Sequence, residues 1–185
     1  RQRLEPQASA SADHDVHAYR QRSAVDPALQ AHAQQIDPDN RLLWRQRFRR
    51  VDAEPLRDAM LSAAGLLDRQ LFGSPIPVAR RPDGEVNVAD GQNDRRRSIY
   101  VQVLRGNPLT MLQAHDQPVM ETNCTRRGRS TVSTQALTLL NSDAAVAYAQ
   151  AFADRALREV PDAPLPFVVI TALSREAAAN ELSEF

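Results

Sequence analysis

The stretch Asp52-Ala-Glu-Pro-Leu-Arg-Asp-Ala-Met-Leu-Ser-Ala-Ala-Gly-Leu-Leu-Asp-Arg-Gln-Leu71 carries the strongest helical pattern in the chain. Leu56, Met60 and Leu67 recur at the spacing of one helix face. Glu54, near the start of the stretch, suits the positive end of a helix dipole. Gly73 follows at a position where a left-handed residue can end a helix. We therefore predict a helix over residues 52–71 and a mainly α fold built around it.

Weaker helical patterns lie on both sides of this stretch. Asp26-Pro27 is a typical helix opening, with the aspartate as cap and the proline in the first turn. The predicted helices cover residues 28–36, 109–114, 133–141, 142–160, 165–173 and 175–185. Residues 98–104 alternate β-branched and aromatic residues with polar ones and are the best strand candidate.

These patterns define the expected organisation of the chain. Residues 1–25 are polar and lack a clean period, so we expect a partly disordered N-terminal segment. Residues 26–185 are expected to form a single mainly helical domain with long ordered loops, as a fragment of a larger multidomain protein. A small β element is expected at about residues 86–104, with Pro82-Asp83-Gly84 as a tight turn before it.

Composition excludes several classes of function. The 23 basic residues, all of them arginine, balance 23 acidic residues, which argues against a broad nucleic-acid surface. No apolar run approaches the roughly 20 residues of a membrane-spanning helix. We therefore expect neither a nucleic-acid partner nor a membrane span. The single cysteine cannot form an internal disulfide.

Polar side chains are densest between His115 and Asn141, and this stretch supplies most of the candidate site residues. The candidate contacts for an anion or another ligand are Arg97, Asp116, Arg126, Arg127 and Gln135. In a functional interpretation the arginines form a fork that binds a carboxylate or phosphate. In the alternative interpretation they pair with nearby acids and hold a long loop in place.

Other constellations give weaker hypotheses. Cys124 could act as a nucleophile only with a base such as His115, and an inert or partner-linked thiol is the alternative. His14 and His17 have helix-face spacing but lie in the polar start, so no metal site is expected. The chain has no Cys-x-x-Cys-His motif, so we expect no haem or other cofactor in this fragment.

Five segments, in order along the chain, resemble one protein family. The segments are Tyr19–Ser23, Asp37–Leu61, Arg96–Pro108, His115–Arg127 and Thr131–Ser142. The family is a domain of unknown function at the C-terminus of large secreted proteins, typical of planctomycetes, that carry a cytochrome c-like domain near the other end. The chain departs from the family pattern at His115, Ser133 and Val51, where an aromatic residue, a proline and a leucine are usual.

The resemblance implies a secreted or periplasmic helical domain and no defined reaction. Our leading hypothesis is a non-catalytic accessory or interaction module. Its expected partners are the N-terminal domains of its own full-length chain, with a cell-surface polymer as a further candidate. In that protein a haem would sit on a separate domain. The alternative is part of an enzyme that acts on extracellular polysaccharide or another polymer, with Asp116, Arg126 and Arg127 in a cleft.

Overall fold

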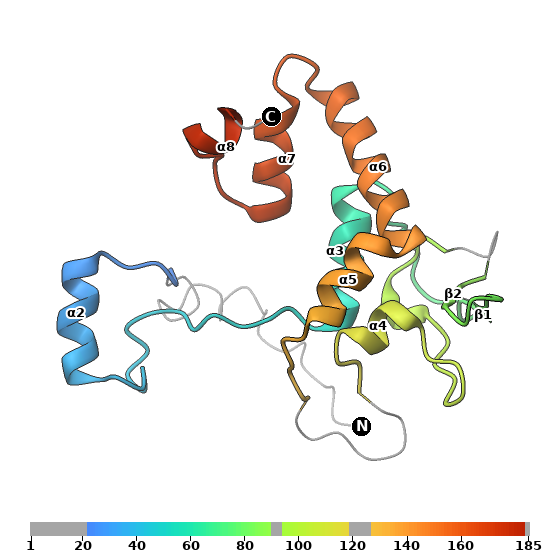
Figure 1. Cartoon of the computed structure of the whole chain (residues 1–185), viewed down its shortest axis with the longest axis horizontal. Coiled ribbons are helices and arrows are strands. Elements are labelled where there is room, and N and C mark those ends of the chain that lie inside the picture. Colours follow the sequence, from blue (N-terminus) through green and yellow to red (C-terminus); the bar gives the residue numbers. More distant parts are fainter. Residues whose placement is uncertain (1–21, 90–93, 119–126, 184–185) are drawn as a thin grey trace, which may run out of the picture. The chain divides into compact units, whose positions relative to one another are not determined.

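The computed structural model describes residues 22–89, 94–118 and 127–183. The chain divides into two compact units, Arg1–Arg50 and Val51–Phe185. Helices dominate and one small antiparallel sheet accompanies them, which confirms the mainly α fold with a small β element (Figure 1). The boundary expected after residue 25 and the single domain expected over residues 26–185 stay predictions.

Helix α2, Pro27–Ile36, lies in the described part of the first unit. The helix begins where the sequence predicts, with Asp26 as its cap. The Asp26 carboxylate accepts hydrogen bonds from the backbone N–H of Ala28, at 2.9 Å, and of Leu29, at 3.4 Å. None of its residues is buried. Capping rather than a hydrophobic core therefore defines where this helix begins.

A loop ordered by polar side chains follows α2. The Asp37 carboxylate accepts from the backbone N–H of Leu42 at 2.7 Å and of Arg41 at 3.0 Å, and these bonds lower its pKa. The indole N–H of Trp44 donates to the Asp37 carbonyl at 2.9 Å. Asn40 binds the Arg45 carbonyl at 2.7 Å. The loop is held by local hydrogen bonds of the kind that aspartate and asparagine form in turns.

Helix α3, Ala53–Ala63, opens the second unit and is shorter than predicted. It ends because Gly65 adopts a left-handed conformation with φ of +71°. The N–H of Leu66 binds the Leu61 carbonyl at 2.8 Å and the N–H of Gly65 binds the Ser62 carbonyl at 3.0 Å, which is the Schellman pattern. The predicted end near Gly73 is therefore wrong, although Gly73 also has a positive φ.

The sheet is a hairpin of β1, Val78–Arg80, and β2, Val86–Val88, with Val78 opposite Val88 and Arg80 opposite Val86. Its turn contains the predicted Pro-Asp-Gly sequence, and Gly84 has a φ of +92° there. The hairpin lies partly outside the range expected for the β element, because its first strand precedes residue 86.

The strand predicted over residues 98–104 does not form. Ser98–Tyr100 is instead a short 3₁₀ turn, η2, followed by an isolated bridge between Ile76 and Val101. The physical reason lies on α3, where Asp58 accepts from the Ser98 backbone N–H at 2.6 Å and Arg57 donates to the Ser98 hydroxyl at 3.2 Å. These side-chain bonds hold the backbone in a turn despite its strand-like sequence.

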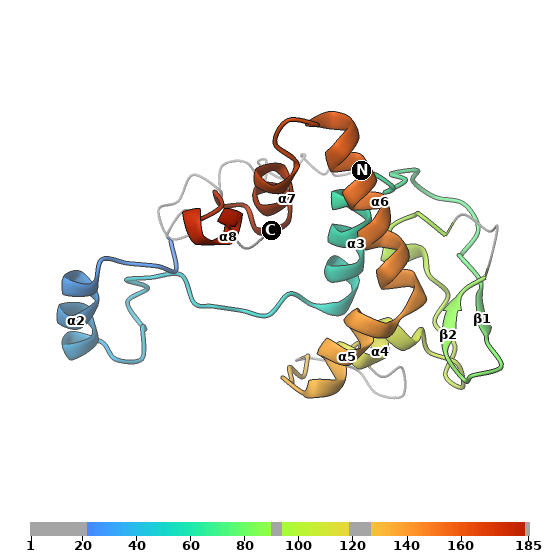
Figure 2. The ribbon, with the colours of Figure 1, turned by 45° about the horizontal axis from the view of Figure 1, so that its top comes forward.

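The remaining helices complete the second unit. They are α4 (Thr110–Ala114), α5 (Ser133–Asn141), α6 (Asp143–Glu159), α7 (Pro164–Leu173) and α8 (Ala179–Ser183). Figure 2 shows α6 running beside α3, with α5 and α4 next to one end of the pair. The predicted positions of α4 to α7 are confirmed to within a few residues. The last helix covers only part of the expected 175–185.

The hydrophobic core is small and lies between α3, α4 and the residues that flank the hairpin. Its buried residues are Ala53, Ile76, Val101, Leu109 and Leu112, with Val78, Val88 and Tyr100 packed against them. The buried face of α3 carries Ala53, Arg57 and Leu61, whereas the predicted stripe residues Leu56 and Met60 are only half-buried. The stripe was misplaced because an arginine occupies the buried face.

Candidate functional site

Asp116 lies just after α4 and organises the chain that leads into α5. Its carboxylate accepts from the Ser130 backbone N–H at 2.6 Å and from the Ser130 hydroxyl at 2.8 Å. The Gln135 amide donates to the same hydroxyl at 3.2 Å and lies 3.5 Å from the carboxylate. Asp116, Ser130 and Gln135 thus form one hydrogen-bonded network, which joins segments 14 residues apart in sequence.

Gln135 also defines the start of α5. Its side-chain oxygen accepts from the backbone N–H of Val132, the residue that precedes the helix, at 3.2 Å. The side chain is 1% exposed and belongs to the only buried residue of α5. An N-terminal glutamine that bonds back in this way satisfies a donor that the helix leaves unpaired.

Arg127 and Arg129 pair with acids at the start of α3. The Arg127 Nη1 atom lies 2.6 Å from the Glu54 carboxylate and 3.9 Å from that of Asp52. Arg129 reaches Asp52 at 3.4 Å. Asp52, the residue before α3, makes no side-chain capping bond and is engaged in these ion pairs. Cys124 and Arg126 lie outside the described residues.

Arg97 pairs with the next acid along the same helix. Its Nε atom lies 3.5 Å from the Asp58 carboxylate, whose other oxygen accepts from the Ser98 backbone N–H. The Arg97 side chain is about half-exposed, so this pair is screened by solvent and stabilises the fold little.

Both ion pairs line one pocket with a volume of about 640 Å³. Its polar lining comes from Asp52, Glu54, Asp58, Arg97, Ser98, Gln117 and Arg127, and its apolar lining from Pro55, Leu67, Ile99, Val101 and Val103. The structure therefore brings Arg97 and Arg127 together and places Asp116 and Gln135 in the separate network.

The pocket combines acidic and basic side chains. Three carboxylates and two guanidinium groups line it, and each arginine faces an acid. The Ser98 hydroxyl accepts from the buried guanidinium of Arg57, and within the part of the chain that the structure describes no histidine or cysteine lines the pocket. Among the described residues, Ser98 therefore has no histidine partner of the kind that commonly activates a serine nucleophile.

Two buried arginines were missed by the sequence interpretation. Arg57, which is 1% exposed, donates to the carbonyl of Arg96 at 3.0 Å and to that of Asp94. Arg96 in turn donates to the Ser74 carbonyl at 2.9 Å and stacks 4.1 Å from the ring centre of Tyr100. Charged side chains are rarely buried, and in a chain whose basic residues are all arginines no single one stands out.

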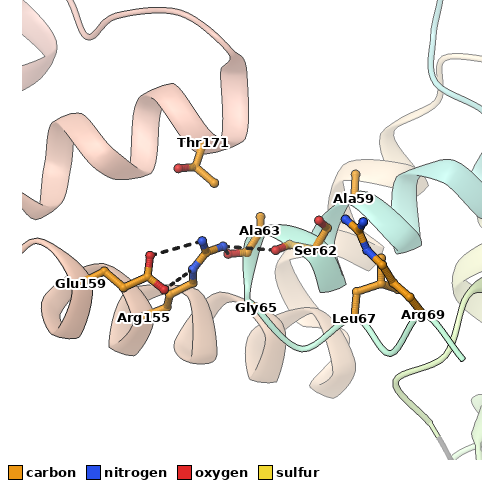
Figure 3. A pocket seen from close by; sticks show the side chains of 9 residues that line it. All are labelled: Ala59, Ser62, Ala63, Gly65, Leu67, Arg69, Arg155, Glu159 and Thr171. Atoms are coloured by element: carbon orange, nitrogen blue, oxygen red, sulfur yellow. Dashed lines mark hydrogen bonds and ion pairs between the residues drawn. The ribbon is translucent and has the colours of Figure 1, made fainter.

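A second pocket of about 620 Å³ lies at the other end of α3, between that helix, α6 and α7 (Figure 3). Arg155 on α6 bonds to Glu159 one turn later, at 2.9 Å, and to the Ala63 carbonyl at 2.8 Å. The hydrogen bond from Arg155 lowers the pKa of Glu159. Arg69 and Thr171 also line this pocket.

Two classes of site are not found in the part of the chain that the structure describes. Within residues 22–89, 94–118 and 127–183, no group of three or more histidine, cysteine or acidic side chains could hold a metal ion. His14 and His17 lie outside those ranges. None of the described helices is both long and apolar enough to cross a membrane.

Comparison with known proteins gives one match. Residues 16–185 match the model of a family that is described as a protein of unknown function, DUF1553. Neither the curated proteins nor the solved structures contain a match to the chain. The family match covers nearly the whole sequence and includes all five segments on which the resemblance rested. The chain therefore belongs to the DUF1553 family of proteins of unknown function.

Proposed function

We propose that this chain is a non-catalytic interaction module of a larger protein, and that α7 carries the surface by which it docks. The observation behind this proposal is that the most apolar helix has no buried residue. Thr171 is the only polar residue of α7, yet Ile170 is 51% exposed and Leu173 58% exposed. A helix that is apolar all round is normally buried.

The candidate site residues support a structural role. Asp116 and Gln135 satisfy one another through Ser130, and Arg97 and Arg127 each face a carboxylate. Groups that bind a substrate usually retain unsatisfied hydrogen-bonding capacity directed at a cavity. The network and the ion pairs instead fasten loops onto α3 and α5.

The proposed partners are the N-terminal domains of the module's own full-length protein. The resemblance supports this choice, because the related proteins carry a cytochrome c-like domain near their other end. On this proposal the protein is secreted or periplasmic, its haem is held by that separate domain, and this chain contributes no cofactor ligand.

Hydrogen exchange tests the docking proposal. We expect α7 amides to exchange more slowly in the full-length protein than in the 185-residue chain, because the docked domain covers the exposed leucine and isoleucine. Replacing Ile170 and Leu173 with glutamate should remove the difference, and Gln150→Glu on the exposed side of α6 should leave it intact. Equal exchange of α7 in both proteins would contradict the proposal.

A second candidate, part of an enzyme acting on a polysaccharide, is favoured by the pocket that Arg97 and Arg127 line. Carboxylates and arginines in an open pocket suit the many hydroxyl groups of such a polymer. In that case Arg97→Ala and Arg127→Ala should abolish turnover while far-UV circular dichroism stays unchanged. Full turnover by both variants would exclude this candidate.

A further inference from the structure

On one side of the pocket between α3, α6 and α7, Arg155 is held by hydrogen bonds to other residues of the chain. Arg155 donates through Nη1 to the carbonyls of Ser62, at 3.2 Å, and Ala63, while Nε and Nη2 donate to Glu159. The guanidinium also lies 5.3 Å from the ring centre of Phe167. Figure 3 shows these bonds of Arg155, which join α6 to the end of α3; Arg155 and Glu159 are called the Arg155 clamp below.

The clamp leaves no net charge on its side of the pocket, because the charges of Arg155 and Glu159 cancel. It is also closely fitted, since a Cβ atom on Gly65 would lie 3.1 Å from the Arg155 Cδ atom. A packed and doubly bonded guanidinium is poorly placed to move toward a ligand. Arg155 therefore shapes the pocket more than it binds within it.

Arg69 is the second arginine that lines this pocket. Among residues 22–89, 94–118 and 127–183, no side chain or carbonyl forms a hydrogen bond or ion pair with its guanidinium. Figure 3 places Arg69 at the opposite end of the pocket from Glu159. The pocket thus carries one unbalanced positive charge at one end.

Two hydroxyl groups accompany this charge. Ser62 on α3 and Thr171 on α7 both line the pocket, and neither hydroxyl is hydrogen-bonded to any residue that the structure describes. Thr171 is the only polar residue of α7, so its position at the pocket is notable for such an apolar helix. The side chains of Ala59, Ala63 and Leu67 supply an apolar surface between the polar groups.

We infer that this pocket binds a small hydroxylated monocarboxylate, whose carboxylate pairs with Arg69 and whose hydroxyl groups bond to Ser62 and Thr171. A single free guanidinium matches one negative charge, and its planar fork matches a carboxylate. A doubly charged phosphate would find no second free cation among the lining residues. The volume of about 620 Å³ accommodates a molecule the size of a sugar acid.

Titration of the ¹⁵N-labelled 185-residue chain with sodium glucuronate tests the inference. We expect a saturable shift of the Arg69 Nε–Hε signal, and no such shift with glucose or with the methyl ester of glucuronate. Sodium chloride at equal ionic strength separates this effect from general screening. A shift that glucose or chloride reproduces would overturn the inference, as would the absence of saturation.

Variants locate the binding. Arg69→Gln should weaken glucuronate binding at least tenfold, and Thr171→Val should weaken it several-fold. Arg105→Gln removes an exposed arginine outside the pocket and should leave binding unchanged. Wild-type affinity in Arg69→Gln would overturn the inference. If that variant does not fold, the comparison of glucuronate with its methyl ester in the unaltered chain decides the question.

Discussion

At the scale of single residues, buried polar side chains replace part of the hydrophobic core of the second unit. Arg57 uses its guanidinium to bind two carbonyls and a hydroxyl in the segment 94–98, and Gln135 binds a helix start and a hydroxyl. Buried polar groups are tolerated when their hydrogen bonds are made. The side-chain hydrogen bonds of Arg57 and Gln135 therefore hold segments without regular secondary structure against the helices.

Replacing Gln135 with alanine tests this role. The change leaves the Val132 N–H without its acceptor and takes a donor from Ser130, so we expect a loss of about 1–3 kcal/mol in the free energy of unfolding. Urea denaturation followed by circular dichroism measures it. The control Gln150→Ala changes an exposed residue of α6 and should alter stability by less than about 0.5 kcal/mol. Equal stability of the two variants would contradict the assigned role.

The capping role of Gln135 could be predicted from the sequence, whereas the burial of Arg57 could not. A glutamine just inside an apolar helix start has a known capping role, whereas an arginine is expected on the surface. Arg57 instead occupies the buried face of α3, and this shifted the true stripe away from Leu56 and Met60. Pairing of Arg127 with Glu54 was equally hidden, because it joins positions 73 residues apart.

At the scale of elements, the end of α3 depends on one glycine. Gly65 has a left-handed backbone and lies against the Arg155 side chain. Gly65→Ala should cost about 1–2 kcal/mol, because a Cβ atom is disfavoured at positive φ and would press on Arg155. Thermal unfolding measures the change. Gly106→Ala has open space around its Cβ position and should be nearly neutral, so a similar loss in both variants would contradict this explanation.

Helix α8 is held by an ion pair that depends on pH. Arg175 donates to both carboxylate oxygens of Glu181, at 2.7 Å and 2.5 Å, and lowers the pKa of Glu181 to about 2. A depressed carboxyl pKa stabilises the folded state above the ordinary value of 4.5, and this contribution is lost as the pH falls toward 2. Helix α8 should therefore lose its order in that acidic range.

Carbon-13 NMR titration of the Glu181 carboxyl checks this expectation. Its midpoint should lie at about 2 in the unaltered chain and move up toward 4.5 in Arg175→Gln. Glu159, which is bound by Arg155 on another helix, should titrate identically in both proteins. An unchanged Glu181 midpoint in the variant would show that Arg175 is not the cause of the shift.

The elements also show where local sequence patterns are overridden. Helix α2 follows its aspartate cap, helices α4 to α7 lie where their sequence patterns predict them, and the hairpin turn forms at Gly84. Residues 98–101 have a strand-like pattern, but bonds from Arg57 and Asp58 hold them in a turn. Those bonds join positions about 40 residues apart, which no local window of sequence can reveal.

At the scale of the whole molecule, the tryptophan that dominates the fluorescence lies in one unit, and most of the described helices lie in the other. Trp44, the only tryptophan, belongs to the unit Arg1–Arg50, where its indole binds Asp37. Helices α3 to α8 belong to the unit Val51–Phe185 and dominate the circular dichroism signal. The two spectroscopic signals therefore report on different units.

We expect the two signals to follow different transitions when urea unfolds the chain. The first unit has no buried residue in α2 and is ordered mainly by local hydrogen bonds, whereas the second has a hydrophobic core. Trp44 fluorescence should therefore change at a lower urea concentration than ellipticity at 222 nm, since coincident probes are the mark of a single cooperative transition. Asp37→Ala removes the acceptors for Arg41 and Leu42, so it should move only the fluorescence transition to lower urea. If both probes instead moved together in this variant, the two units would be coupled, and the expected single domain over residues 26–185 would be the better description.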